Sequence, residues 1–115
     1  MEIAVILGST RTKANPRLGE RVAKYVMNEA GKAEGAKFRL LDLVSYDLPI
    51  FNGKMPPLRD PEQEKPENVG RWLSDVAEAD GFVVLTTEYN QHPPPALLNA
   101  FDYITHDVTP VKKAY

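Results

Sequence analysis

The apolar residues of this chain fall into short runs separated by stretches with helical spacing. Residues 3–7 are apolar without a break, which is typical of a parallel strand covered on both faces. Residues 38–43 predict a second strand, and Arg39 and Asp42 interrupt its apolar pattern, which indicates a position nearer the edge of a sheet. Residues 82–85 predict a third strand, short and buried.

Helical spacing separates these runs. Residues 16–30 predict an amphipathic helix with apolar residues at Leu18, Val22, Tyr25 and Val26. A second helix carries one apolar face, made of Val69, Trp72, Leu73, Val76 and Ala77. A third is predicted from about residue 96 to 104. Residues 107–115 predict a loop that leads towards a further strand.

The strand–helix order predicts an α/β fold with a doubly wound parallel sheet. Right-handed crossovers give the flavodoxin-like order, in which strand two lies beside strand one and strand one beside strand three. The topological switch then lies between strands one and three, so we expect the loops 8–19 and 86–95 to face one crevice. A third loop, residues 48–58, contains Ile50, Phe51 and Met55, and we expect it to be packed.

Composition narrows the classes of function. The length of 115 residues predicts a single domain, residues 1–115. A net charge of −2 gives no reason to expect nucleic acid or an anionic membrane as partner. The chain has no cysteine, which excludes thiolate chemistry and disulfides. No apolar run approaches the length of about 20 residues of a membrane span, and we expect a cytoplasmic location.

The first loop has the features of an anion site. Gly8 breaks the first strand, the hydroxyls of Ser9 and Thr10 follow, and Arg11, Lys13 and Arg17 are cationic. Asn15 and Pro16 are typical of a helix start, and free backbone N–H groups at a helix start bind phosphate. The loop lacks the lysine of an NTPase loop and the later glycines of a dinucleotide fingerprint, which favours a single phosphate. The alternative is an ordinary strand-to-helix turn.

The second loop places Glu88, Tyr89 and Asn90 directly after the third strand. An aromatic ring beside carboxylate and amide groups can stack on a flat heterocycle and form hydrogen bonds with it. The alternative is that Tyr89 is a boundary aromatic with its hydroxyl in water. His92 is interpreted as a solvated loop residue. Neither a paired carboxylate nor metal-ligand spacing is present in the sequence.

Taken together, these segments make the chain resemble the NADPH-dependent FMN reductase family of flavodoxin-like quinone, azo and chromate reductases. The matching pieces are spread over about the first 105 residues: 8–11, 48–51, Trp72, 79–81, 86–90, Pro94, Leu97, Asn99 and Asp102. The family's sheet has two further strands, so the resemblance implies that this domain is short at its C-terminal end. It also implies a homo-oligomer.

The resemblance implies non-covalently bound FMN and NADPH or NADH as electron donor. Ser9 and Arg11 match the phosphate-loop positions, Thr10 adds a hydroxyl beside them, and either Asn15 or Arg17 provides a further contact. The segment of Glu88, Tyr89 and Asn90 matches the one that lines the flavin ring. The flavin carries the chemistry in this family, so we assign no catalytic side chain and no metal.

Three functions follow from this. The first is an FMN-dependent oxidoreductase that passes electrons from NAD(P)H to a small-molecule quinone, azo, flavin or metal-oxyanion acceptor. The second is a non-catalytic flavin- or nucleotide-binding module, or a fragment that needs the missing strands. The third, an electron-carrier flavodoxin, is less favoured because a net charge of −2 does not indicate a strongly acidic partner face.

Overall fold

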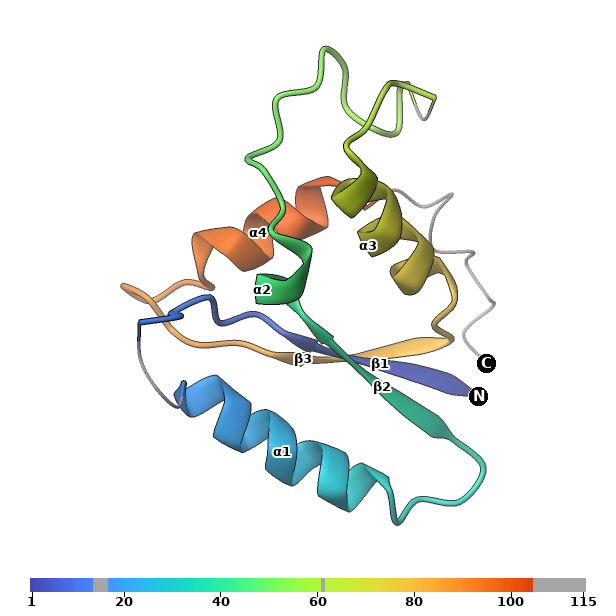
Figure 1. Cartoon of the computed structure of the whole chain (residues 1–115), viewed down its shortest axis with the longest axis vertical. Coiled ribbons are helices and arrows are strands. Elements are labelled where there is room, and N and C mark those ends of the chain that lie inside the picture. The colour runs from blue at the N-terminus through green and yellow to red at the C-terminus, as the bar shows by residue number, and fades with distance from the viewer. Residues whose placement is uncertain (14–16, 61, 105–115) are drawn as a thin grey trace.

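The computed structural model describes residues 1–13, 17–60 and 62–104. Within these ranges the strands and helices follow the predicted order, with one additional short helix after the second strand (Figure 1). In chain order they are β1 (Glu2–Leu7), α1 (Leu18–Ala30), β2 (Lys37–Asp42), α2 (Leu43–Tyr46), α3 (Glu67–Ala77), β3 (Gly81–Leu85) and α4 (Pro95–Asp102). The helices in the described part of the chain are all too short or too polar to cross a membrane.

The described strands form one parallel sheet in the order β2-β1-β3, which confirms the predicted topology. The register pairs Ile6 of β1 with Leu41 of β2 and with Val84 of β3. Helix α1 covers one face of this sheet, and α2, α3 and α4 lie over the other (Figure 1). The middle strand, β1, is buried on both faces from Ala4 to Leu7, as its unbroken apolar run predicts.

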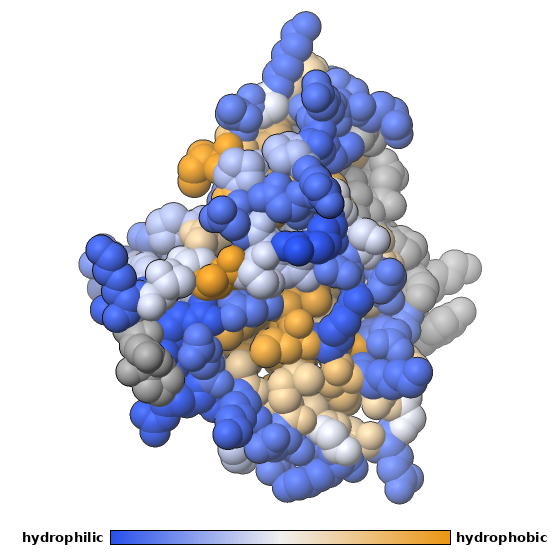
Figure 2. Space-filling view, viewed as in Figure 1, coloured by the Kyte–Doolittle hydropathy of each residue, from blue (hydrophilic) through white to orange (hydrophobic). Residues whose placement is uncertain are grey.

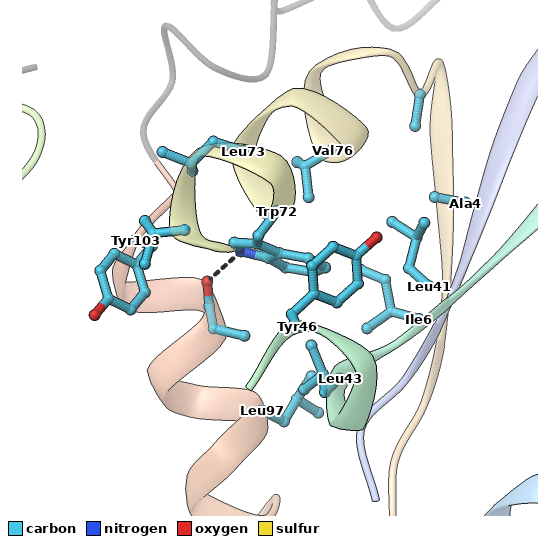
Figure 3. Close-up of a cluster of buried hydrophobic side chains, with 13 residues drawn as sticks. Ala4, Ile6, Leu41, Leu43, Tyr46, Trp72, Leu73, Val76, Leu97 and Tyr103 are labelled. Atoms are coloured by element: carbon cyan, nitrogen blue, oxygen red, sulfur yellow. Dashed lines mark hydrogen bonds between the residues drawn. The ribbon is translucent and has the colours of Figure 1, made fainter. Parts of the chain in front are cut away.

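The hydrophobic core lies between the sheet and the layer of α2, α3 and α4. Its largest member is Trp72 of α3, whose ring is fully buried and meets Tyr46 of α2 edge-on, with ring centroids 5.2 Å apart. The indole N–H donates a hydrogen bond of 3.0 Å to the carbonyl oxygen of Ala100 in α4 (Figure 3). Because a buried indole N–H needs a partner, this bond fixes α3 against α4.

Helix α1 packs on the opposite face through small residues. Its buried positions are Gly19 and Ala23, whereas Leu18 and Tyr25 are 67% and 66% exposed. A Cβ atom added at Gly19 would lie 2.8 Å from Leu7 Cδ1, so glycine is what permits this close approach.

Figure 2 shows an apolar patch, surrounded by hydrophilic residues, in the middle of the face viewed in Figure 1.

Two of the predicted strands differ from the structure. The second strand ends at Asp42 rather than at residue 43, because the Asp42 carboxylate accepts a hydrogen bond from the Val44 N–H and begins the short helix α2. Strand β3 is not buried: Phe82, Val83 and Val84 are 36–41% exposed. The cause is its position at the edge of the described sheet, where β1 is its only described neighbouring strand.

The loop 48–58 is packed only in part. The amide of Asn99 in α4 accepts a hydrogen bond from the Phe51 N–H and donates one to the Pro49 carbonyl oxygen. The Phe51 ring meets Tyr103 edge-on at 5.3 Å. Ile50 and Met55, which were expected to pack as well, are 74% and 41% exposed. The loop is therefore held on α4 by its first residues. The predicted loop 107–115 lies outside the described residues.

Candidate functional site

The two polar loops meet at the carboxyl ends of β1 and β3. The N–H of Gly8 donates a hydrogen bond of 2.9 Å to the carbonyl oxygen of Leu85, which extends the strand pairing into the loops. A Cβ atom at Gly8 would lie 3.0 Å from Leu97 Cδ2 and 3.3 Å from the Leu85 oxygen. A residue without a side chain thus lets both loops and α4 approach one another at this point.

A cavity of about 800 Å³ lies between these loops and the first turns of α1. Its volume is in the range of small-molecule and cofactor sites, about 300–1,000 Å³. The apolar part of its lining comes from β1, α1 and β3 and includes Leu7, Val22 and Val84. The polar part includes the predicted site residues Ser9, Arg11, Arg17, Glu88 and Tyr89. The predicted crevice between the loops is therefore present.

The other predicted site residues either do not line this cavity or are not described by the structure. Thr10 lines a neighbouring cavity of about 370 Å³, together with Thr12 and residues of α2 and α4. Asn90 is not among the residues that line either cavity. Asn15 lies outside the described residues. A contact of Thr10, Asn15 or Asn90 with a ligand stays a prediction.

The two arginines of the first loop have opposite environments. Arg11 is exposed and forms no ion pair with any described residue. Arg17 is 4% exposed and pairs with Glu20 and Asp42. Burial alone would lower the pKa of Arg17, but the hydrogen bonds and charges of Asp42 and Glu20 outweigh it, so the pKa is raised.

The second loop contains a tight turn. The backbones of Tyr89 and His92 exchange two hydrogen bonds, of 2.9 and 3.1 Å. The two residues between them have positive φ, 50° at Asn90 and 68° at Gln91, which is the geometry of a type I′ hairpin turn. Glu88 accepts a hydrogen bond from the Gln91 N–H through its carboxylate. Glu88 therefore stabilises the turn that presents Tyr89.

Two hydroxyl groups in this loop lack a partner within the described part of the chain. Thr87 Oγ1 and the Tyr89 hydroxyl are buried without a hydrogen bond to any described residue, and both residues line the larger cavity. Buried hydroxyls are nearly always paired in folded proteins, with protein or with water. Buried hydroxyls without a described partner beside a cavity indicate that a polar ligand or ordered water forms hydrogen bonds with them.

Sequence reasoning missed three contributors to this site. Thr87 was not predicted as a site residue, and neither Asp42 nor Glu20 was identified as a partner of Arg17. A signal for Asp42 was available, since it is a carboxylate at the carboxyl end of a mainly apolar strand. No group of three or more His, Cys, Asp or Glu residues that could hold a metal occurs in the part of the chain that the structure describes.

Comparison with known proteins extends these observations. The family model described as NADPH-dependent FMN reductase matches residues 1–114. An NAD(P)H-dependent FMN reductase of Schizosaccharomyces pombe is 35% identical over 107 residues, which are 92% of this chain and 52% of the relative. An NADPH azoreductase of a Bacillus species is 34% identical over 105 residues, 91% of this chain and 51% of the relative.

A 2-hydroxy-1,4-benzoquinone reductase of a Burkholderia species is 28% identical over 104 residues, 90% of this chain and 49% of the relative. The chain thus spans about half the length of the curated relatives it matches.

Proposed function

This chain belongs to the NADPH-dependent FMN reductase family, and on that premise we propose that it binds FMN in the cavity between its two polar loops. The observation that carries the proposal is the cavity of about 800 Å³ that both loops line. When bound, the flavin supplies hydride transfer from NADPH or NADH and electron transfer to an acceptor. The protein's own residues bind and orient it.

The lining offers the two kinds of group that such a cofactor needs. For the phosphate, Arg11 offers a guanidinium without an ion pair to any described residue and Ser9 a hydroxyl, and the first turn of α1, which lines the same cavity, favours an anion. For the flat ring, Thr87 and Tyr89 offer hydroxyls without a described partner, which can pair with its polar atoms. Apolar residues such as Val22 and Val84 also line the cavity and reduce the access of water.

We propose small-molecule acceptors, because reductases of an azo compound and of a benzoquinone are among the relatives. A homo-oligomer and a cytoplasmic location complete the proposal; both come from the resemblance and the composition. Sedimentation velocity measures the first and cell fractionation the second. A monomer in solution would argue against the oligomer without affecting the proposed cofactor.

The test is a titration of the chain with FMN and with riboflavin, which lacks the phosphate, followed by flavin fluorescence. Replacing Arg11 with alanine should weaken FMN binding by about 1.5–3 kcal/mol, the contribution of a hydrogen bond to a charged group. Riboflavin binding should change little. Arg59→Ala is the matched control, because Arg59 is exposed, lies outside the cavity and contributes the same charge. Equal losses for both ligands would contradict the phosphate contact.

NADPH oxidation, measured in the same preparation with a quinone acceptor, separates the enzyme from a binding module. Turnover supports the oxidoreductase. Flavin binding without turnover favours the non-catalytic module. If neither FMN nor riboflavin binds, the proposed function is wrong for this chain.

A further inference from the structure

Arg17 lies where the first loop, the end of β2 and the start of α1 meet. Its Nη1 donates a hydrogen bond of 2.5 Å to the carbonyl oxygen of Ser9, and its Nε donates one of 2.7 Å to Glu20 Oε1. Its Nη2 donates to the carboxylate of Asp42. All three guanidinium nitrogens are therefore engaged by groups of the protein itself.

The charges around Arg17 do not favour a phosphate contact. Glu20 and Asp42 place two carboxylates on one guanidinium, so this cluster as a whole carries one negative charge. An anion brought next to it meets repulsion that the single guanidinium does not offset. Arg11 has no such partners among the described residues. The cation available to a phosphate at this cavity is therefore Arg11.

The partners of Arg17 come from three different segments. Ser9 follows β1, Asp42 ends β2 and Glu20 lies in the first turn of α1. Ser9 is itself only 3% exposed, and a Cβ atom at Gly19 would lie 3.1 Å from Ser9 Cβ. The first turn of α1 thus rests directly on Ser9, and the guanidinium holds the Ser9 carbonyl in place.

We propose that Arg17 is a positioning residue rather than a ligand contact. Together with the Ser9 carbonyl, Glu20 and Asp42 it forms what we call the Arg17 clamp, which sets the shape of the loop 8–12 so that Ser9 and Arg11 face the cavity. The ligand part of this inference rests on the proposed function. The clamp itself is a property of the chain without ligand.

The variant Asp42→Asn distinguishes a phosphate contact by Arg17 from a positioning role, because the two roles predict opposite changes in FMN affinity. If Arg17 contacts the phosphate, removal of the Asp42 charge frees the guanidinium and FMN binds more tightly. If Arg17 positions the loop, the weakened clamp loosens it, and we expect FMN to bind about tenfold more weakly. Asp42 also caps α2 through the Val44 N–H at 3.1 Å, and asparagine is an equally good cap, so this second contact is retained.

Hydrogen exchange on the chain without ligand tests the clamp directly. Arg17→Ala and Asp42→Asn should each accelerate amide exchange in residues 8–12 about tenfold, because local opening becomes easier. Arg21→Ala and Glu29→Gln are matched controls on the same helix. Arg21 is not among the residues that line the cavity between the loops, and Glu29 forms an ion pair with Lys32 at 2.6 Å and with no other described residue. Neither should change the exchange.

The outcomes distinguish the clamp from the cofactor. Unchanged exchange in Asp42→Asn, or tighter FMN binding by that variant, overturns the positioning role. Should Arg17→Ala fail to fold, Arg17→Lys replaces it, since lysine keeps the charge but lacks the planar fork that serves three partners. If the unaltered chain binds no FMN, the proposed function fails, while the exchange measurements still decide whether the clamp holds the loop.

Discussion

Helices α1 and α3 have similar amphipathic patterns in the sequence, but they differ in what they bury. Helix α3 buries the four large residues Val69, Trp72, Leu73 and Val76. Helix α1 buries only Gly19 and Ala23 and leaves Leu18, Val22 and Tyr25 between 44% and 67% exposed. The same periodicity therefore marks a core helix in one case and a helix held close to the sheet by small residues in the other.

The difference between the two helices indicates that one contributes mainly to stability and the other mainly to the site. On the α3 side, large side chains from helices and sheet interdigitate around Trp72, and such burial is the main source of folding free energy. On the α1 side, the absence of a side chain at Gly19 brings the helix start onto Ser9, and both Gly19 and Ser9 line the cavity. We infer that α3 contributes mainly to stability and α1 mainly to the geometry of the ligand loop.

The largest expected difference between the two helices comes from truncating one aromatic residue in each. Trp72→Ala should lower the free energy of unfolding by about 3–5 kcal/mol, because it removes a fully buried ring and its hydrogen bond to Ala100. Tyr25→Ala, on the exposed side of α1, should change it by less than about 0.5 kcal/mol.

Urea denaturation followed by circular dichroism measures both variants. A loss from Tyr25→Ala close to that from Trp72→Ala would show that the exposed side of α1 is covered in solution. The division between a core helix and a site helix would then be wrong.

A glycine-to-alanine pair tests the same contrast at smaller magnitude. Gly70 in α3 has open space around it, so Gly70→Ala should stabilise the chain by about 0.5–1 kcal/mol through helix propensity. Gly19→Ala should instead destabilise it by about 1–3 kcal/mol, since the new methyl group would collide with Leu7 and crowd Ser9. Thermal unfolding of the two variants measures the signs, and a stabilising Gly19→Ala would contradict the close approach of α1.

A further effect, modest at neutral pH, concerns the anchoring of α3. The Tyr46 hydroxyl donates a hydrogen bond of 2.6 Å to Asp75, and burial, followed by this bond, raises the pKa of Tyr46. The folded chain therefore holds this proton more tightly than the unfolded one, and this stabilisation is lost as the pH rises above the ordinary tyrosine pKa of about 10.

Tyr46→Phe should cost about 1 kcal/mol at pH 7 and make the free energy of unfolding less dependent on pH above about 10. Urea unfolding at pH 7, 9, 10 and 11 measures this, with Tyr25→Phe as control for an exposed hydroxyl on α1. An unchanged alkaline slope in Tyr46→Phe would show that Tyr46 does not carry the effect.

Much of the fold was predictable because the signals are local. The unbroken apolar run of β1 predicted the middle strand, and the alternation of strands and helices with the crossover rules predicted the order β2-β1-β3. The same rules placed Ser9 and Arg11 opposite Glu88 and Tyr89, which the structure brings to one cavity. The comparisons confirm the family that these loops resemble.

Other features were not predictable because they depend on contacts distant in sequence. The exposure of β3 depends on what lies beside its edge, which an apolar run does not reveal. The short helix α2 depends on a cap from Asp42 to Val44. Arg17 and Asp42 are 25 positions apart, and no local sequence pattern reveals a pairing over that distance. The sequence therefore predicted Arg17 as a cation available to a phosphate.

By itself, then, the sequence determined the α/β order, the middle strand and the two loops that carry the polar chemistry, because each follows from periodicity and from residue type over a few neighbours. Only the tertiary structure decided how deep each helix lies and which arginine has no ion pair among the described residues, since both depend on the distances between segments. Arg11 and Arg17 are six positions apart in one loop, but packing leaves one charge in solvent and compensates the other with two carboxylates.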